Sequence, residues 1–149
     1  MILIFLDDVL RTPKGSPLYE GVALYHALKE SGKLSVLCKD RVDAERWLKA
    51  SNVGAIDEII DYSYITAVDN KDMALVEYCR SQGKVELVIT ASVPMAEQLL
   101  EQGLHTILFL HPLYIRPEFR PDGRGRRSWD AITAELDRQQ ELYSEDPRV

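Results

Sequence analysis

The chain has 149 residues, of which 46% are hydrophobic and 28% charged, and its formal net charge at pH 7 is −6. This length predicts one domain over residues 1–149 with a single core, and the acidic balance argues against binding to a nucleic-acid polymer. No apolar run approaches the roughly 20 residues that span a bilayer, so we expect no membrane association.

Two further features of the sequence indicate a cytoplasmic protein. The apolar start lacks the basic leader of a signal peptide and ends in two acids. Cys38 and Cys79 are too few for a disulfide framework and fit a reducing compartment.

His26, His105 and His111 are scattered, and no Cys/His cluster has the spacing of zinc ligands.

Strands and helices alternate along the first 110 residues. Apolar runs predict five strands, over residues 2–6, 34–38, 55–62, 86–90 and 106–110. Helical periodicity predicts intervening helices over residues 20–31, 42–50, 69–81 and 94–102. This order predicts an α/β domain, a three-layer sandwich around a mainly parallel five-stranded sheet. Candidates for its core are Val42, Trp47 and Leu48, with Met73 and Met95 on later helices.

The first strand organises the rest of the chain. Residues 2–6 are five apolar residues without a polar break, as expected of a strand buried on both faces. Asp7 and Asp8 follow directly, and parallel sheets bind ligands just beyond the carboxyl ends of their strands. Both carboxylates are therefore ligand-binding candidates. The alternative is a loop start in which they cap the N–H groups of a turn.

Polar residues also follow the other central strands. Lys39 follows the second strand, Thr90 ends the fourth with Ser92 just beyond it, and His111 directly follows the fifth. Because parallel strands share one carboxyl edge, we expect these side chains to face the same ligand as Asp7. For His111, an ordinary loop histidine is an equal alternative.

The stretch from 111 to 129 contains three Pro, two Gly and five Arg. An arginine fork matches phosphate oxygens, and aromatic rings stack on nucleotide bases. Arg116, Arg120 and Tyr114 are thus candidates to hold a phosphorylated ligand. The alternative is an irregular segment whose arginines balance the surrounding acids.

The last part of the chain predicts a helix capped by Ser128. Ile132, Leu136 and Tyr143 fall on one face of that helix. With the Arg/Pro-rich loop before it, the helix forms an appendage over residues 111–149. It docks either on the core or on a second copy of the chain, so a homo-oligomer stays open.

The first strand and its acids resemble the first motif of the haloacid dehalogenase (HAD) superfamily, an apolar strand ending in Asp-x-Asp-x-(Thr/Val)-Leu. Asp7, Val9 and Leu10 match the second Asp, the Thr/Val and the Leu, and Phe5 stands where the family has its nucleophilic Asp. Cys38 takes the place of the second-motif Ser or Thr. Chain length leaves no room for a large cap domain, so only the loop over residues 11–17 is expected to cover the site.

The remaining motifs of the family are also incomplete. Thr90 and Ala91 replace the acid pair that holds Mg²⁺ in the fourth motif, and Lys71 is a counterpart of the third-motif lysine. Phe5 cannot attack phosphorus, and Mg²⁺ needs several hard oxygen ligands. The resemblance therefore implies that catalysis is lost, and we expect neither a cofactor nor a metal.

These features favour a HAD-like protein that binds a phosphorylated small molecule, foremost a nucleotide, without hydrolysing it. Its size and degenerate motifs look similar to HAD-like proteins of bacteriophages, which would suit sequestration of a host nucleotide signal such as a cyclic or ADP-ribose-derived messenger. Two alternatives stay open. One is a HAD-type phosphatase or 5′-nucleotidase that uses Asp7 and Asp8. The other is an interaction module with a vestigial pocket.

Overall fold

The computed structural model describes residues 1–54, 56–110 and 129–145, with side chains in the last segment described from residue 133. Its strands form one sheet in the order β3-β2-β1-β4-β5. The strands are β1 (Ile2–Phe5), β2 (Leu34–Leu37), β3 (Glu58–Ile60), β4 (Leu87–Thr90) and β5 (Thr106–Leu108). All four neighbouring pairs are parallel. The predicted α/β class and five-stranded sheet are confirmed, and the sheet is parallel throughout.

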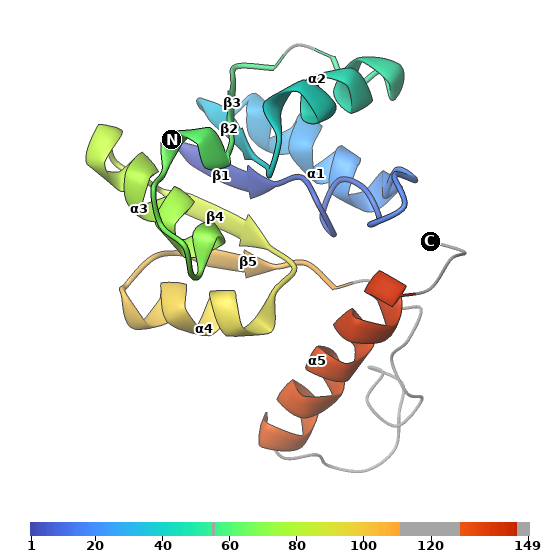
Figure 1. Ribbon diagram of the computed structural model, residues 1–149, viewed down its shortest axis with the longest axis vertical. Helices are drawn as coiled ribbons and strands as arrows, with labels where there is room; N and C mark the ends of the chain where they lie inside the picture. The colour runs from blue at the N-terminus through green and yellow to red at the C-terminus, as the bar shows by residue number, and fades with distance from the viewer. Residues whose placement is uncertain (55, 111–128, 146–149) are drawn as a thin grey trace.

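The helices alternate with the strands as predicted. They are α1 (Tyr19–Lys29), α2 (Arg41–Ala50), α3 (Lys71–Gln82), α4 (Val93–Glu101) and α5 (Trp129–Glu145), with a short 3₁₀ turn η1 (Tyr62–Tyr64). Helices α1 and α2 cover one face of the sheet, and α3 and α4 cover the other (Figure 1). Helix α5 lies beyond the carboxyl ends of the strands (Figure 1). Among the described helices, none is both long and apolar enough to cross a bilayer.

The connections between the strands create a switch point at the centre of the sheet. From β1 the chain moves outward to β2 and then β3, and from β3 it crosses to β4 and continues to β5. The crevice outside β1 and β4 therefore separates two sets of connections that run in opposite directions. In open parallel sheets such a switch point is where ligands bind.

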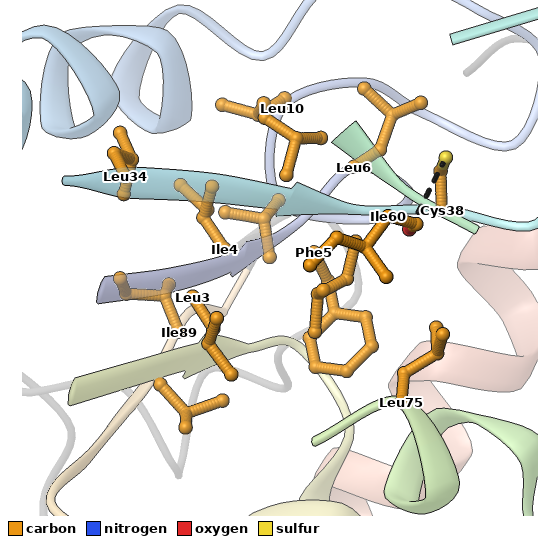
Figure 2. Packing of buried hydrophobic residues seen from close by; sticks show 14 of the residues in the cluster. Leu3, Ile4, Phe5, Leu6, Leu10, Leu34, Cys38, Ile60, Leu75 and Ile89 are labelled. Carbon is orange, nitrogen blue, oxygen red and sulfur yellow. Dashed lines mark hydrogen bonds between the residues drawn. The ribbon is translucent and has the colours of Figure 1, made fainter. Parts of the chain in front are cut away.

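Strand β1 is buried on both faces, as its unbroken apolar run predicts. Leu3 and Ile4 are fully buried, and Phe5 is 8% exposed. Successive side chains alternate between the two faces of a strand. Figure 2 shows the Phe5 ring on the side of β1 where Leu75 of α3 lies. The last residue of β1 thus carries an aromatic ring at the carboxyl edge of the sheet.

One predicted core position is wrong. Val42 was expected to pack inside with Trp47, but it is 61% exposed, whereas Ala44 and Leu48 are the buried residues of α2. Each helical residue turns the chain by about 100°, so Val42 and Ala44, two residues apart, point to nearly opposite sides of the helix. Trp47 packs against the edge of the core, and the predicted burial of Met73 and Met95 is confirmed.

Candidate functional site

A pocket of about 550 Å³ lies at the carboxyl edge of the sheet, at the switch point between β1 and β4. This volume falls in the range of small-molecule sites. The sheet side of the lining consists of Phe5, Asp7, Asp8, Leu37, Cys38, Lys39, Thr90, Ala91, Ser92 and Pro94. The helices contribute Asp72, Asp137, Gln140, Glu141 and Ser144.

The structure therefore brings five candidates from the sequence together in one pocket. These residues are Asp7, Asp8, Lys39, Thr90 and Ser92. They come from three strand ends that share one edge because the strands are parallel. Their contact with a ligand remains a prediction. The other four candidates, His111, Tyr114, Arg116 and Arg120, lie outside the described residues.

Asp7 is held by an ion-pair network. The Arg11 guanidinium donates from Nε to Asp7 Oδ1 at 2.7 Å and from Nη2 to Asp43 Oδ2 of α2, also at 2.7 Å. The Arg11 side chain is only 14% exposed and lies 5.8 Å from the centre of the Trp47 ring. One carboxylate oxygen of Asp7 is thus occupied, and the ion pair fixes the orientation of the carboxylate.

The loop over residues 11–17 was expected to cover the site, but contacts with α2 hold it elsewhere. The Trp47 indole N–H donates to the Gly15 carbonyl at 2.7 Å, so the loop is tied to α2. None of residues 11–17 lines the pocket, and the helical cover comes from α5 instead. The loop cannot cover the site because Arg11 and Trp47 hold it against the face of the sheet that α1 and α2 occupy (Figure 1).

Asp8 occupies an unusual backbone and electrostatic position. Its φ is 68°, in the left-handed region that Asp and Asn tolerate better than most residues. Its Oδ1 atom is buried and accepts no hydrogen bond from any described residue. Burial, and to a lesser extent the charge of Asp7, raises the pKa of Asp8 to about 6, although Lys39 acts in the opposite direction. The pKa of this carboxyl group therefore lies closer to neutral pH than that of an ordinary aspartate.

Hydrogen-bond donors gather at the ends of β2 and β4. Thr90 is 3% exposed, and its Oγ1 accepts from the Ser92 backbone N–H at 3.1 Å. Ser92 caps α4, where its Oγ accepts from Met95 N at 3.4 Å. Each hydroxyl still has its own hydrogen to donate. With the Lys39 ammonium and the positive end of the α4 dipole, they can hold an anion.

Three lining residues at positions that the sequence comparison with HAD motifs singled out carry no carboxylate. Phe5 and Ala91 line the pocket. Cys38 donates from Sγ to the Ile60 carbonyl at 3.8 Å, and burial is the main cause that raises its pKa to about 12, so it stays a thiol. Among the described residues, no group of three or more His, Cys, Asp or Glu could hold a metal ion.

Five polar lining residues on the helices were not among the candidates from the sequence, and the position of one of them could have indicated it. Asp72 stands in the first turn of α3, directly after a strand-to-helix connection that ends at the ligand-bearing edge. Its neighbour Lys71, suggested as the third-motif lysine, is not in the lining; its Nζ lies 5.2 Å from the Tyr62 ring. Asp137, Gln140, Glu141 and Ser144 recur at helical spacing on one face of α5, but only docking of that helix makes them part of a pocket.

No protein-family model matches the chain, and no curated protein or solved structure is significantly similar to it. The parallel sheet with the order β3-β2-β1-β4-β5 is consistent with Rossmann-like and HAD-like folds.

Proposed function

We propose that the chain is a catalytically inactive HAD-like protein that binds a phosphorylated small molecule, foremost a nucleotide, without hydrolysing it. One observation carries this proposal. The residue that ends β1 at the switch-point pocket is Phe5, and a phenyl ring cannot attack phosphorus. A pocket with anion-binding donors but no nucleophile at this position suits binding without turnover.

The donors for the phosphate come from neighbouring elements. Lys39, Thr90 and Ser92 line the pocket at the ends of β2 and β4, next to the N-terminus of α4. A charge-assisted hydrogen bond to phosphate is stronger than a neutral one, so Lys39 is the main anchor among these three. Arg116 and Arg120 follow β5 in the chain and are proposed to complete the phosphate site.

Binding without turnover has a plausible biological use. A protein that holds a nucleotide and does not consume it lowers the free concentration of that nucleotide. In a bacteriophage protein, this would serve to sequester a host immune signal such as a cyclic or ADP-ribose-derived messenger. The proposed ligand class is therefore a nucleotide with accessible phosphate and base.

One observation favours a second candidate, a HAD-type phosphatase or 5′-nucleotidase. Asp8, with a pKa of about 6, is suited to give up a proton near neutral pH, and Asp7 is adjacent to it. In that mechanism Asp7 would attack phosphorus and Asp8 would protonate the leaving group. Arg11 disfavours the attack, because its bond to Asp7 Oδ1 reduces the nucleophilicity of the carboxylate.

A combined turnover and binding experiment tests the proposal. With Mg²⁺ and a panel of phosphomonoesters and nucleotides, the purified protein should release no phosphate above a denatured control. At least one nucleotide should raise its melting temperature, and Lys39→Ala should weaken that binding about tenfold or more. Lys49→Ala, an exposed substitution on α2, is the matched control and should leave binding unchanged.

The other outcomes separate the alternatives. Phosphate release that disappears in Asp7→Asn would establish the nucleotidase and overturn the proposal. A complete lack of nucleotide binding would overturn it as well, and would favour an interaction module with a vestigial pocket.

A further inference from the structure

The charges that line the pocket are unbalanced. Five carboxylates belong to the lining, those of Asp7, Asp8, Asp72, Asp137 and Glu141, and Lys39 is the one basic residue among the described lining residues. Arg11, which is not in the lining, forms an ion pair with Asp7 and so balances its charge. A phosphate placed next to the remaining carboxylates would be repelled, so the part of the ligand that faces them must carry hydrogen-bond donors.

Asp72 is oriented for such a contact. The Tyr62 hydroxyl donates to Asp72 Oδ1 at 2.7 Å. The Lys71 Nζ atom lies 5.2 Å from the centre of the Tyr62 ring. Burial, followed by this hydrogen bond, raises the pKa of the Tyr62 hydroxyl, so it remains a donor. Tyr62 thereby holds the Asp72 carboxylate in one orientation and leaves Oδ2 available to a ligand.

Helix α5 adds two carboxylates to the lining, and one of their oxygen atoms accepts no hydrogen bond from a described residue. Asp137 and Glu141 are four residues apart and therefore lie on one face of the helix. The Asp137 Oδ1 atom is buried and accepts no hydrogen bond from any described residue, which is also true of Asp8 Oδ1 across the pocket. A buried acceptor without a donor is destabilising. The carboxylates of Asp137 and Glu141 belong to the lining, where a ligand in the pocket can supply donors.

The side of the pocket formed by Asp72 and the polar residues of α5, called the acidic wall, matches sugar hydroxyls better than a metal ion. Ionised carboxylates are acceptors only, whereas Gln140, between the two acids of α5, offers both a donor and an acceptor. Sugar hydroxyls need this mixture because each of them donates one hydrogen bond and accepts others. A metal would need several ligands converging on one point. No group of three or more His, Cys, Asp or Glu among the described residues could hold one.

We propose that Asp72, Asp137 and Glu141 bind the ribose hydroxyls of the ligand, so that the pocket selects ribose-containing phosphorylated compounds over their deoxy forms. This inference rests on the proposed function, and it narrows the ligand class to ribonucleotides and related ribose phosphates. The phosphate lies at Lys39, Thr90 and Ser92, and the sugar spans the pocket toward α3 and α5. Tyr62 is a positioning residue that acts through Asp72.

Calorimetry with paired probes tests this inference. AMP is compared with 2′-deoxy-AMP, and ribose 5-phosphate with 2-deoxyribose 5-phosphate; the ribose form of each pair should bind about tenfold or more tightly. In Asp72→Asn and Tyr62→Phe the ratio of the dissociation constants of the deoxy and ribose forms should fall toward one. The affinity for the deoxy form should stay the same. Asp69→Asn and Tyr64→Phe, whose side chains lie outside the lining, are the matched controls and should keep the full preference.

The two proposals fail in different ways. Equal affinity for the ribose and deoxy forms in the wild type would overturn the ribose contact and leave phosphate binding intact. A full preference in Asp72→Asn, with the fold verified by circular dichroism, would also overturn it. Absence of binding to all four probes would overturn this inference; a nucleotide outside the four that raised the melting temperature would still uphold the proposed function.

Discussion

Asp8 is the residue whose environment departs most from that of an ordinary carboxylate in the pocket. It combines a left-handed backbone, a buried Oδ1 atom without a described partner and a pKa raised to about 6. The sequence offered two interpretations of Asp8, as a turn cap or as a ligand contact. Asp8 lies in the lining of the pocket, and its Oδ1 caps no N–H group among the described residues. Contact of Asp8 with a ligand stays a prediction.

The raised pKa of Asp8 predicts a pH-dependent stability. The folded state binds the Asp8 proton more tightly than the unfolded chain, where the pKa is near 3.8. Its favourable contribution is therefore complete below pH 4 and is lost as the pH rises through 6. Asn cannot ionise and tolerates the positive φ, so Asp8→Asn should be more stable than the wild type at pH 7.5 by about 1–2 kcal/mol, after a reduction for solvent screening.

Urea unfolding at pH 4, 6 and 7.5 measures this difference. The advantage of Asp8→Asn should shrink to nearly zero at pH 4, where both side chains are neutral. Asp69→Asn, an exposed substitution, is the control and should follow the wild type at each pH. Equal stability of Asp8→Asn and the wild type at pH 7.5 would contradict burial of the charge.

At the scale of elements, α1 holds the segment that follows β1. A glycine in a helix is normally unfavourable compared with alanine, yet Gly21 lies inside α1 and is buried. A Cβ at this position would lie 1.8 Å from the Val9 carbonyl oxygen. The backbone of α1 therefore approaches the chain just after Asp8 so closely that only glycine fits, and this contact supports the edge of the pocket.

This close approach predicts a large effect of a small substitution. Gly21→Ala should destabilise the fold by at least about 2 kcal/mol, because the clash is with backbone that cannot rotate away. Gly32→Ala is the matched control, since nothing lies within 4 Å of its Cβ. It should be neutral or slightly stabilising, by about 0.4–1 kcal/mol. Denaturant midpoints of the two variants give the comparison, and similar losses in both would contradict the packing argument.

Helix periodicity identified the elements better than it identified their buried faces. The predicted and observed helices agree within about two residues, and Pro94 falls in the first turn of α4 as expected. The buried face of α2 was assigned wrongly at Val42, because hydrophobic character alone did not show which side of a short helix meets the sheet. On α5, Tyr143 from the predicted apolar face is buried, at 4% exposure.

At the scale of the whole molecule, the site depends on the direction of every strand. Parallel strands bring residues 7, 39, 90 and 92 to one edge, and the reversal of strand order opens a crevice between β1 and β4. Strand β5 continues toward this same edge, and the five arginines between residues 111 and 129 come after it in the chain.

This order predicts that the arginine-rich segment contributes to ligand affinity. Arg116→Ala and Arg120→Ala should each weaken the binding of a stabilising nucleotide about tenfold or more, because each removes a charge-assisted hydrogen bond of roughly 1.5–3 kcal/mol. Neither should change the melting temperature of the free protein. Arg80→Ala is the control, because Arg80 lies near the end of α3 opposite Asp72 and pairs with Gln102.

Titration calorimetry of the three variants with one nucleotide measures these affinities. Unchanged affinity in both Arg116→Ala and Arg120→Ala would remove the segment from the binding site. Lys39, Thr90 and Ser92 would then have to hold the phosphate alone.

The sequence by itself determined the fold class, the five strands and five of the residues in the pocket. Local patterns suffice for this, because an unbroken apolar run implies a buried strand and parallel strands share one carboxyl edge. The docking of α5, the tether between the 11–17 loop and α2, and the acidic wall of the pocket were decided only by the tertiary structure. These features arise from contacts between segments distant in the chain, such as Asp8 and Asp137 at the same pocket, and no local periodicity encodes such pairs.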